Sequence, residues 1–154
     1  MKKHRLLIAG AAISLFALAP LGAYGAEPAF PWGQITVTPS TGLADGQTVQ
    51  VSGTDFLKNT ELRIIECGPS QGIPPTGGFV GAICTNYSVA VTTDADGSFA
   101  AQGFTVSAVI EGARWSHGHN VPATYDCTVA NDCHIHVFAA VTGTGAANQD
   151  ISFG

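Results

Sequence analysis

Histidine is the residue type with the clearest capacity for chemistry in this sequence, because four of the five histidines form two His-x-His pairs. The pairs are His117 with His119 and His134 with His136. Side chains at i and i+2 of a strand point to the same face, so each pair can share a ligand. Neutral imidazoles bind Zn²⁺ or Cu²⁺, and two pairs folded together would complete a tetrahedral site. Because the motif is short, we expect no metal site and keep the four-histidine site only as an alternative.

A serine-nucleophile motif is present only as a string of letters. Gly68, Ser70 and Gly72 have the G-x-S-x-G spacing of a hydrolase elbow. The elbow works on a sharp turn between a strand and a helix, whereas here a proline-rich stretch follows. We therefore expect no catalytic residues and a protein that is not an enzyme.

The four cysteines indicate an oxidised, disulfide-stabilised protein. They are Cys67, Cys84, Cys127 and Cys133, and four cysteines allow three pairings. Sequential pairing, 67 with 84 and 127 with 133, needs the least rearrangement of the chain. The second bridge would pin a short turn, and the first would hold a projecting ribbon against the body of the protein.

The N-terminus has the composition of a secretory signal. Lys2, Lys3 and Arg5 precede an apolar stretch at residues 6–21, and small residues end at Gly25. This pattern predicts a signal peptide over residues 1–25 and one domain over residues 26–154. We therefore expect a secreted, extracellular protein that makes no membrane contact after cleavage.

Cleavage would leave an acidic domain. The mature part would keep three basic residues against all eleven acidic ones. Binding to a phosphate backbone requires clustered Lys and Arg, so we expect no direct binding of nucleic acid. The length suits a monomer with a single core.

Alternating apolar and polar residues predict an all-β fold. Short strands with Gly-Asp punctuation indicate an antiparallel sandwich, and no segment has a helical apolar stripe. The expected strands cover residues 34–38, 48–52, 61–67, 87–92, 98–109, 134–141 and 151–153.

Several segments, in order along the chain, resemble the neocarzinostatin family of enediyne-binding apoproteins. The opening Thr36-Val37-Thr38-Pro39-Ser40-Thr41-Gly42-Leu43 is followed by Asp45-Gly46 and by Val49-Gln50-Val51-Ser52-Gly53. Later matches are residues 91–98, Glu111-Gly112 before Arg114-Trp115, residues 124–127 and the terminal Ile151-Ser152-Phe153. The order and spacing of the cysteines also match, so the resemblance covers essentially all of the expected mature chain.

The resemblance implies a seven-stranded immunoglobulin-like barrel with projecting β-ribbons and a cleft between them. In that family the cleft holds an enediyne chromophore without a covalent bond, and DNA cleavage belongs to the chromophore. No other cofactor is implied. Carried over to this sequence, the ligand-binding residues would be Glu66, Cys67, Cys84, Tyr87, Trp115, His134, His136 and Phe138. Ordinary core packing is an equal alternative for Tyr87 and Trp115.

The sequence also departs from the family pattern. Imidazoles at His134 and His136 and a ring at Phe138 replace small or amide residues, and they could fill the cleft. The loop between Cys67 and Cys84 is longer than in the family. We therefore expect a non-catalytic carrier of a small hydrophobic or aromatic compound of the enediyne type, with any antibacterial or DNA-damaging action exerted through the ligand. The alternatives are an extracellular interaction module with a filled cleft, or a histidine metal-binding protein.

Overall fold

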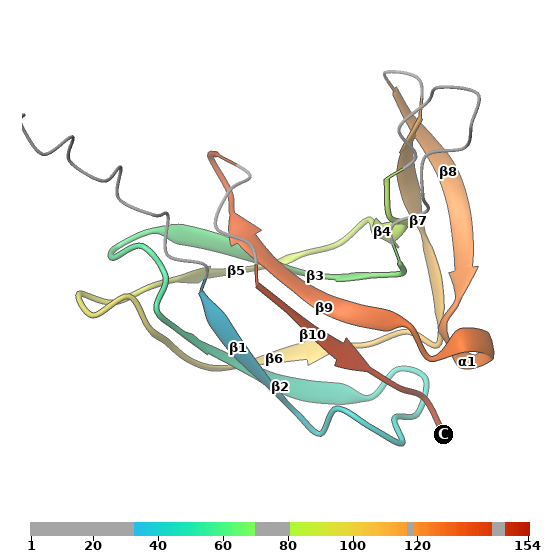
Figure 1. Cartoon of the computed structure of the whole chain (residues 1–154), viewed down its shortest axis with the longest axis horizontal. Coiled ribbons are helices and arrows are strands. Elements are labelled where there is room, and N and C mark those ends of the chain that lie inside the picture. Colours follow the sequence, from blue (N-terminus) through green and yellow to red (C-terminus); the bar gives the residue numbers. More distant parts are fainter. Residues whose placement is uncertain (1–32, 70–80, 117–118, 143–146) are drawn as a thin grey trace, which may run out of the picture.

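The protein is almost entirely β-structure in a computed structural model of the whole chain. The structure describes residues 33–69, 81–116, 119–142 and 147–154, with the side chains of Trp115 and Ser116 excepted. These residues form ten strands and one short helix, in two antiparallel sheets (Figure 1). Within them, no helix is long and apolar enough to cross a membrane.

The smaller sheet has three strands. Its order is β1 (Gln34–Thr38), β2 (Thr48–Thr54) and β6 (Phe99–Thr105), and both pairings are antiparallel. Valines alternate with polar residues along β1 and β2, so Val37, Val49 and Val51 lie on the buried face. This alternation is what the sequence predicts for a half-buried strand.

The larger sheet is built around β3 (Glu61–Cys67). One edge of β3 pairs along its length with β9 (Cys133–Ala139), which pairs in turn with β10 (Ala147–Ile151). The other edge of β3 is shared: β5 (Val89–Thr92) pairs with its first half, and β4 (Cys84–Thr85) pairs at its last residue, Cys67. Along this edge the neighbour of β3 therefore changes from β5 to β4 at the end of the strand.

A two-stranded ribbon continues the larger sheet beyond β4. Its strands are β7 (Val109–Ser116) and β8 (His119–Asp126), and β7 pairs with β4. In Figure 1 the ribbon rises away from the packed body. The helix α1 (Cys127–Ala130) lies at its base and leads into β9. The ribbon is attached at β4, at the link from β6 to β7, and at α1.

The core lies between the two sheets. Leu62 and Ile64 of β3 and Ile135 and Val137 of β9 face Phe104 and the valines of the smaller sheet, all with at most 3 % of their surface exposed. Burial of each such side chain contributes about 1.5–3 kcal/mol relative to exposure. The sheet edges also meet, because the side chain of Gln149 in β10 bonds both the N–H and the C=O of Val37 in β1.

Both disulfides follow the sequential pairing. Cys67 is bonded to Cys84 across β3 and β4, and Cys127 is bonded to Cys133 across α1. The first therefore ties the body to β4 and the ribbon. The second ties the end of β8 to the start of β9.

The strand predictions need three corrections. The predicted strand at residues 98–109 is two strands, β6 and the start of β7, separated by a link at 106–108. The ribbon strands β7 and β8 and the short β4 raise the strand count from the expected seven to ten among the described residues. The predicted last strand at 151–153 is instead the end of β10, followed by a single bridge from Phe153 to Leu43. The predicted signal peptide lies outside the described residues.

Candidate ligand-binding site

Three rings stand in a row on the outer face of β9. His134, His136 and Phe138 are half-buried, while the residues between them, Ile135 and Val137, are fully buried in the core. The His136 and Phe138 rings are stacked, with centroids 5.4 Å apart and an interplanar angle of 28°. The His134 ring lies edge-on to the His136 ring, with centroids 6.3 Å apart. The predicted alternation along this strand is therefore confirmed.

The neighbouring strands extend this row into a surface. In the register between β3 and β9, Ile65 lies opposite His136 and Cys67 lies opposite His134. In the register between β10 and β9, Asn148 lies opposite His136 and Asp150 opposite His134. Side chains opposite one another share a face and touch. We call the surface made by Ile65, His134, His136 and Phe138 the ring face.

Polar contacts fix the imidazoles of the ring face. The Asn148 side-chain oxygen Oδ1 bonds His136 Nδ1. Nδ1 of His136 therefore faces the amide of Asn148, and Nε2 is the ring nitrogen left to face a ligand. Burial lowers the pKa of His134, and the neighbouring His136 lowers it further, against the opposing effect of Asp150. His134 therefore stays neutral at pH 7 and presents an uncharged ring.

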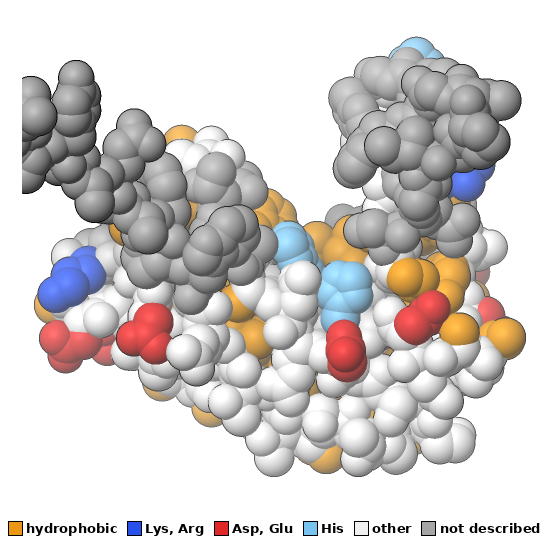
Figure 2. All heavy atoms as spheres, viewed as in Figure 1, with side chains coloured by type: hydrophobic (Ala, Val, Ile, Leu, Met, Phe, Trp, Pro, Cys, Tyr) orange, Lys and Arg blue, Asp and Glu red, His pale blue; other side chains and the backbone are white. Residues whose placement is uncertain are grey.

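The ring face forms the floor of a hollow in the molecular surface. Figure 2 shows the surface hollowed between the packed body and the ribbon, with histidine side chains on its floor. The described histidines on the strands of the floor are His134 and His136. The third, His119, lies at the start of β8 where it pairs with Ser116, at the far end of the ribbon.

The disulfide Cys67–Cys84 lies where the floor meets the ribbon. Cys67 lies opposite His134 on one side and opposite Cys84 on the other. Beyond it, Gly112 of β7 packs so closely on β4 that an added Cβ would lie 1.8 Å from the Cys84 carbonyl oxygen. The structure thus places the predicted bridge beside the predicted histidines.

Glu66 is not on the ring face. Neighbours along a strand point to opposite faces, and Glu66 follows Leu62 and Ile64 into the interior, where its exposure is 0 %. Its Oε2 accepts the Ser107 N–H at 2.9 Å, while Oε1 has no partner among the described residues. Burial raises the pKa of Glu66 to about 7; the Ser107 bond lowers it and the Asp45 carboxylate raises it. Its expected place on the cleft floor is corrected by this geometry.

Tyr87 is also placed away from the ring face. Its ring stacks on the core residue Phe104 with centroids 5.4 Å apart, and its hydroxyl donates to the Thr105 carbonyl. It nevertheless keeps 43 % of its surface exposed. Burial raises the pKa of the Tyr87 hydroxyl, and it lies close enough to Glu66 to feel that charge. The packing alternative describes this residue better than the pocket expectation does.

Trp115 and the remaining histidines complete the predicted set. The Trp115 backbone pairs with Asn120 in the ribbon, and its side chain lies outside the described residues, as does His117. In the part of the chain that the structure describes, no three His, Cys, Asp or Glu side chains gather as a metal site would require. His119 is separated from the ring face by the length of the ribbon, which gives the four-histidine alternative no geometric support.

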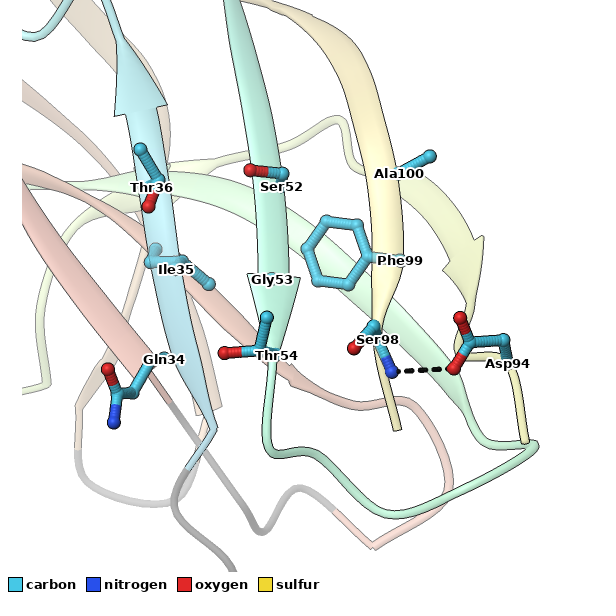
Figure 3. Close-up of a pocket in the computed structure, with 10 residues that line it drawn as sticks. All are labelled: Gln34, Ile35, Thr36, Ser52, Gly53, Thr54, Asp94, Ser98, Phe99 and Ala100. Atoms are coloured by element: carbon cyan, nitrogen blue, oxygen red, sulfur yellow. Dashed lines mark hydrogen bonds between the residues drawn. The ribbon is translucent and has the colours of Figure 1, made fainter. Parts of the chain in front are cut away.

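A separate pocket lies on the smaller sheet. Its volume is about 370 Å³, and Figure 3 shows its lining, which is mostly hydroxyl and amide side chains around Ile35 and Phe99. At its rim Asp94 accepts the Ser98 N–H at 2.9 Å, which closes the predicted Asp-Gly turn. It shares no residue with the ring face.

The sequence did not predict the residues of the neighbouring strands β3 and β10 that lie beside the rings of β9. Ile65, Asn148 and Asp150 carry no motif, and only the strand register brings them beside His134 and His136. Tyr125 was also missed as a structural contact. Its ring packs on Gly68, and its hydroxyl donates to Asp132 at 2.6 Å, which raises the tyrosine pKa to about 12.

Comparison with known proteins agrees with this architecture. The sequence profile of the Neocarzinostatin family matches residues 35–153. The chain belongs to the neocarzinostatin family. Members of this family are non-catalytic apoproteins, so the expectation that the protein is not an enzyme is confirmed by its membership.

Two individual relatives show how far the likeness extends. Macromomycin of Streptomyces macromomyceticus is 41 % identical over 68 residues, which is 44 % of this chain and 43 % of the relative. The sequence match therefore spans less than half of that curated relative. The solved structure of macromomycin superposes with a TM-score of 0.63 at 28 % identity, covering 79 % of this chain and 99 % of that one. The solution structure of apokedarcidin superposes with a TM-score of 0.52 at 29 % identity, and the match covers 80 % of this chain and 99 % of that one.

Proposed function

We propose that this protein is a secreted carrier that binds a small hydrophobic or aromatic compound, without a covalent bond, on the ring face. The observation that carries the proposal is the row of three half-buried rings on the floor of the hollow. Aromatic faces stack on planar ligands, and such pairs contribute about 0.5–1.5 kcal/mol beyond the area they bury. The relatives are apoproteins of enediyne chromoproteins, which supports a carrier role and an enediyne-type ligand.

The polar groups beside the rings would orient the ligand. Nε2 of His136 can form a hydrogen bond with a ligand hydroxyl or amide, because its Nδ1 is held by Asn148. Ile65 and Phe138 offer only apolar surface. Small-molecule sites typically combine such apolar surface with a few polar groups, and the register supplies these as Asn148 and Asp150 on β10 and Arg63 opposite Phe138. Any antibacterial or DNA-damaging action would then belong to the bound compound, since the expected mature chain is acidic.

Fluorescence titration with N-phenyl-1-naphthylamine, a neutral aromatic probe, tests the ring face. Phe138→Ala should weaken binding by about 3- to 10-fold, the range that loss of one stacking partner predicts. The matched control is Val129→Ala, because Val129 is exposed on α1 and touches no part of the ring face. Equal affinities of both variants would place the probe elsewhere.

Native mass spectrometry of the protein from its own host tests the natural ligand. A bound small molecule supports the carrier. A mass without ligand, together with no binding of the probe, would contradict the carrier and favour an extracellular interaction module.

A further inference from the structure

A buried carboxyl group lies at the root of the ribbon, on the opposite side of β3 from the ring face. Glu66 is the only acidic side chain with no exposed surface among the described residues. Its Oε2 accepts the N–H of Ser107, in the link at 106–108 that joins β6 of the body to β7 of the ribbon. This single bond connects the strand that carries Ile65 and Cys67 to the start of the ribbon.

The rest of the link is held by backbone and one further carboxylate. Val106 exchanges bonds with Gly46 and Gln47 in the connection between β1 and β2. The Ala108 N–H donates to Asp45 Oδ1 at 2.9 Å, and the Ala108 carbonyl accepts from the Cys127 N–H. Ser107 is therefore the one position of the link whose N–H depends on a buried ionisable group.

We propose that Glu66 is a positioning residue that holds the root of the ribbon on the body beside the ring face, and that ionisation of its carboxyl group loosens the ribbon and speeds release of the ligand. The coupling of Glu66 to the ribbon concerns the protein without any ligand. Only the effect on ligand release rests on the proposed carrier function.

The direction of the effect follows from the unpaired oxygen. An ionised carboxylate needs bonds at both oxygens, but Oε1 of Glu66 is buried without a partner. Protonation removes the charge and leaves Oε2 able to accept from Ser107. Ionisation at higher pH instead favours any opening that admits water to Oε1, and the segment we expect to open is the link at 106–108, which contacts the other oxygen of the same carboxyl group.

The surroundings of Glu66 support titration near neutrality. Asp45, from the connection between β1 and β2, adds a second negative charge, and Tyr87 adds a hydroxyl that stays neutral. The other neighbours carry no charge: β9 presents Ile135 opposite Glu66, β4 presents Thr85, and the link presents Ser107. No cation faces the carboxyl group from these elements, so burial and Asp45 both favour the protonated form.

The first test uses the protein without ligand. Hydrogen-exchange protection factors of the amides at residues 110–114 are measured from pH 5.5 to 8.5 and corrected for intrinsic exchange. In the unmodified protein they should fall by up to about tenfold per pH unit as the pH rises to 7 and level off above it, because the pKa of Glu66 is about 7 when the link is closed and returns to 4.5 when water reaches the carboxyl group. In Glu66→Gln, an uncharged isostere, they should stay constant. A constant value in the unmodified protein, or the same fall in Glu66→Gln, would overturn the proposal.

Two further measurements keep the test sharp. Glu111→Gln removes a charge from an exposed position on β7 and should keep the pH dependence of the unmodified protein. The carboxyl ¹³C shift of Glu66 should titrate with a midpoint near pH 7, which needs no variant to fold. A midpoint at the ordinary value of 4.5 would contradict the proposal.

The second test adds N-phenyl-1-naphthylamine and measures its dissociation rate. The rate should rise as the pH rises through 7 and then level off in the unmodified protein, and it should stay constant in Glu66→Gln. If the ribbon amides respond to pH but the probe does not bind, the coupling stands and the carrier function fails. If the probe binds and dissociates at a rate independent of pH, the carrier function stands and the positioning role is wrong.

Discussion

At the scale of single residues, adjacent positions on β3 do different work. Cys67 lies beside His134 on the outer face, whereas Glu66 lies inside with an unpaired oxygen. The alternation rule alone separates them, since neighbours in a strand point to opposite faces. What the sequence could not reveal is the partner of Glu66, because Ser107 lies 41 residues away along the chain.

Glu66→Gln should stabilise the protein at pH 8. A carboxyl pKa raised from 4.5 to about 7 means that the folded state holds the proton more tightly than the unfolded state. The resulting stability is fully present below pH 4.5 and is lost as the pH rises through 7. The variant should therefore gain about 1–3 kcal/mol in free energy of unfolding at pH 8. Urea denaturation at pH 4.5 and 8 measures this.

The control for this prediction is Glu111→Gln, which should change stability little at either pH because its carboxylate is exposed. A loss of stability in Glu66→Gln at pH 8 would show that the ionised carboxylate is a favourable partner for Ser107.

At the scale of elements, burial decided which strands the sequence could predict. The predicted bounds 34–38 and 61–67 agree with β1 and β3, and the alternation of β9 also holds, since each packs one face on the core. The strand β7 is buried at its root, at Ile110 and Gly112, but its partner β8 is exposed at five of its first six positions up to Thr124. Without a buried face β8 has no period-two apolar pattern, so a projecting ribbon was expected only from the family resemblance and not from the pattern of these strands.

The junction of β4 with β7 should not tolerate a side chain at Gly112. A Cβ there would lie 1.8 Å from the Cys84 carbonyl oxygen, and backbone cannot move aside as a side chain can. Gly112→Ala should cost about 1–3 kcal/mol, the usual range for overpacking. It should also lower hydrogen-exchange protection in β7 and β8 more than in β2.

Gly103→Ala is the matched control, because the nearest atom to a Cβ added there is the flexible Thr48 methyl group at 3.4 Å. Equal losses in both variants would contradict this account of the junction.

The edges of the two sheets are joined by one side chain. Gln149 Oε1 accepts the Val37 N–H at 2.9 Å, and its Nε2 donates to the Val37 carbonyl. Gln149→Leu leaves these part-buried backbone groups without that partner and should cost about 1–3 kcal/mol. Gln102→Leu, at an exposed site on β6, controls for the loss of an amide. A cost below that of the control would mean that water replaces Gln149 readily.

At the scale of the whole molecule, the ribbon depends on three attachments of different chemistry. The disulfide Cys67–Cys84 and the disulfide Cys127–Cys133 are covalent, and the link at 106–108 is held by hydrogen bonds. Sequential pairing of the cysteines predicted the two disulfides, and the family resemblance implied a cleft beside them. The sequence could not predict the hydrogen bonds of the link, because their partners, such as Glu66 and Asp45, lie far away along the chain.

The ring face and the ribbon root together predict that ligand retention is greatest at a pH below 7 and falls at both more acidic and more alkaline pH. Burial lowers the pKa of His134, so the folded protein prefers the neutral imidazole. A hydrophobic ligand covers that ring further, so binding should weaken as the pH falls through the pKa of His134 in the free protein, which burial holds below its ordinary value. On the alkaline side, ionisation of Glu66 at about pH 7 should loosen the ribbon. The affinity for N-phenyl-1-naphthylamine, plotted against pH from 5 to 8.5, should therefore follow a bell-shaped curve.

His134→Phe should abolish only the acidic limb of this curve, and Glu66→Gln only the alkaline limb. Loss of both limbs in either variant would show that one group controls both, which two sites on opposite faces of β3 and β9 do not allow.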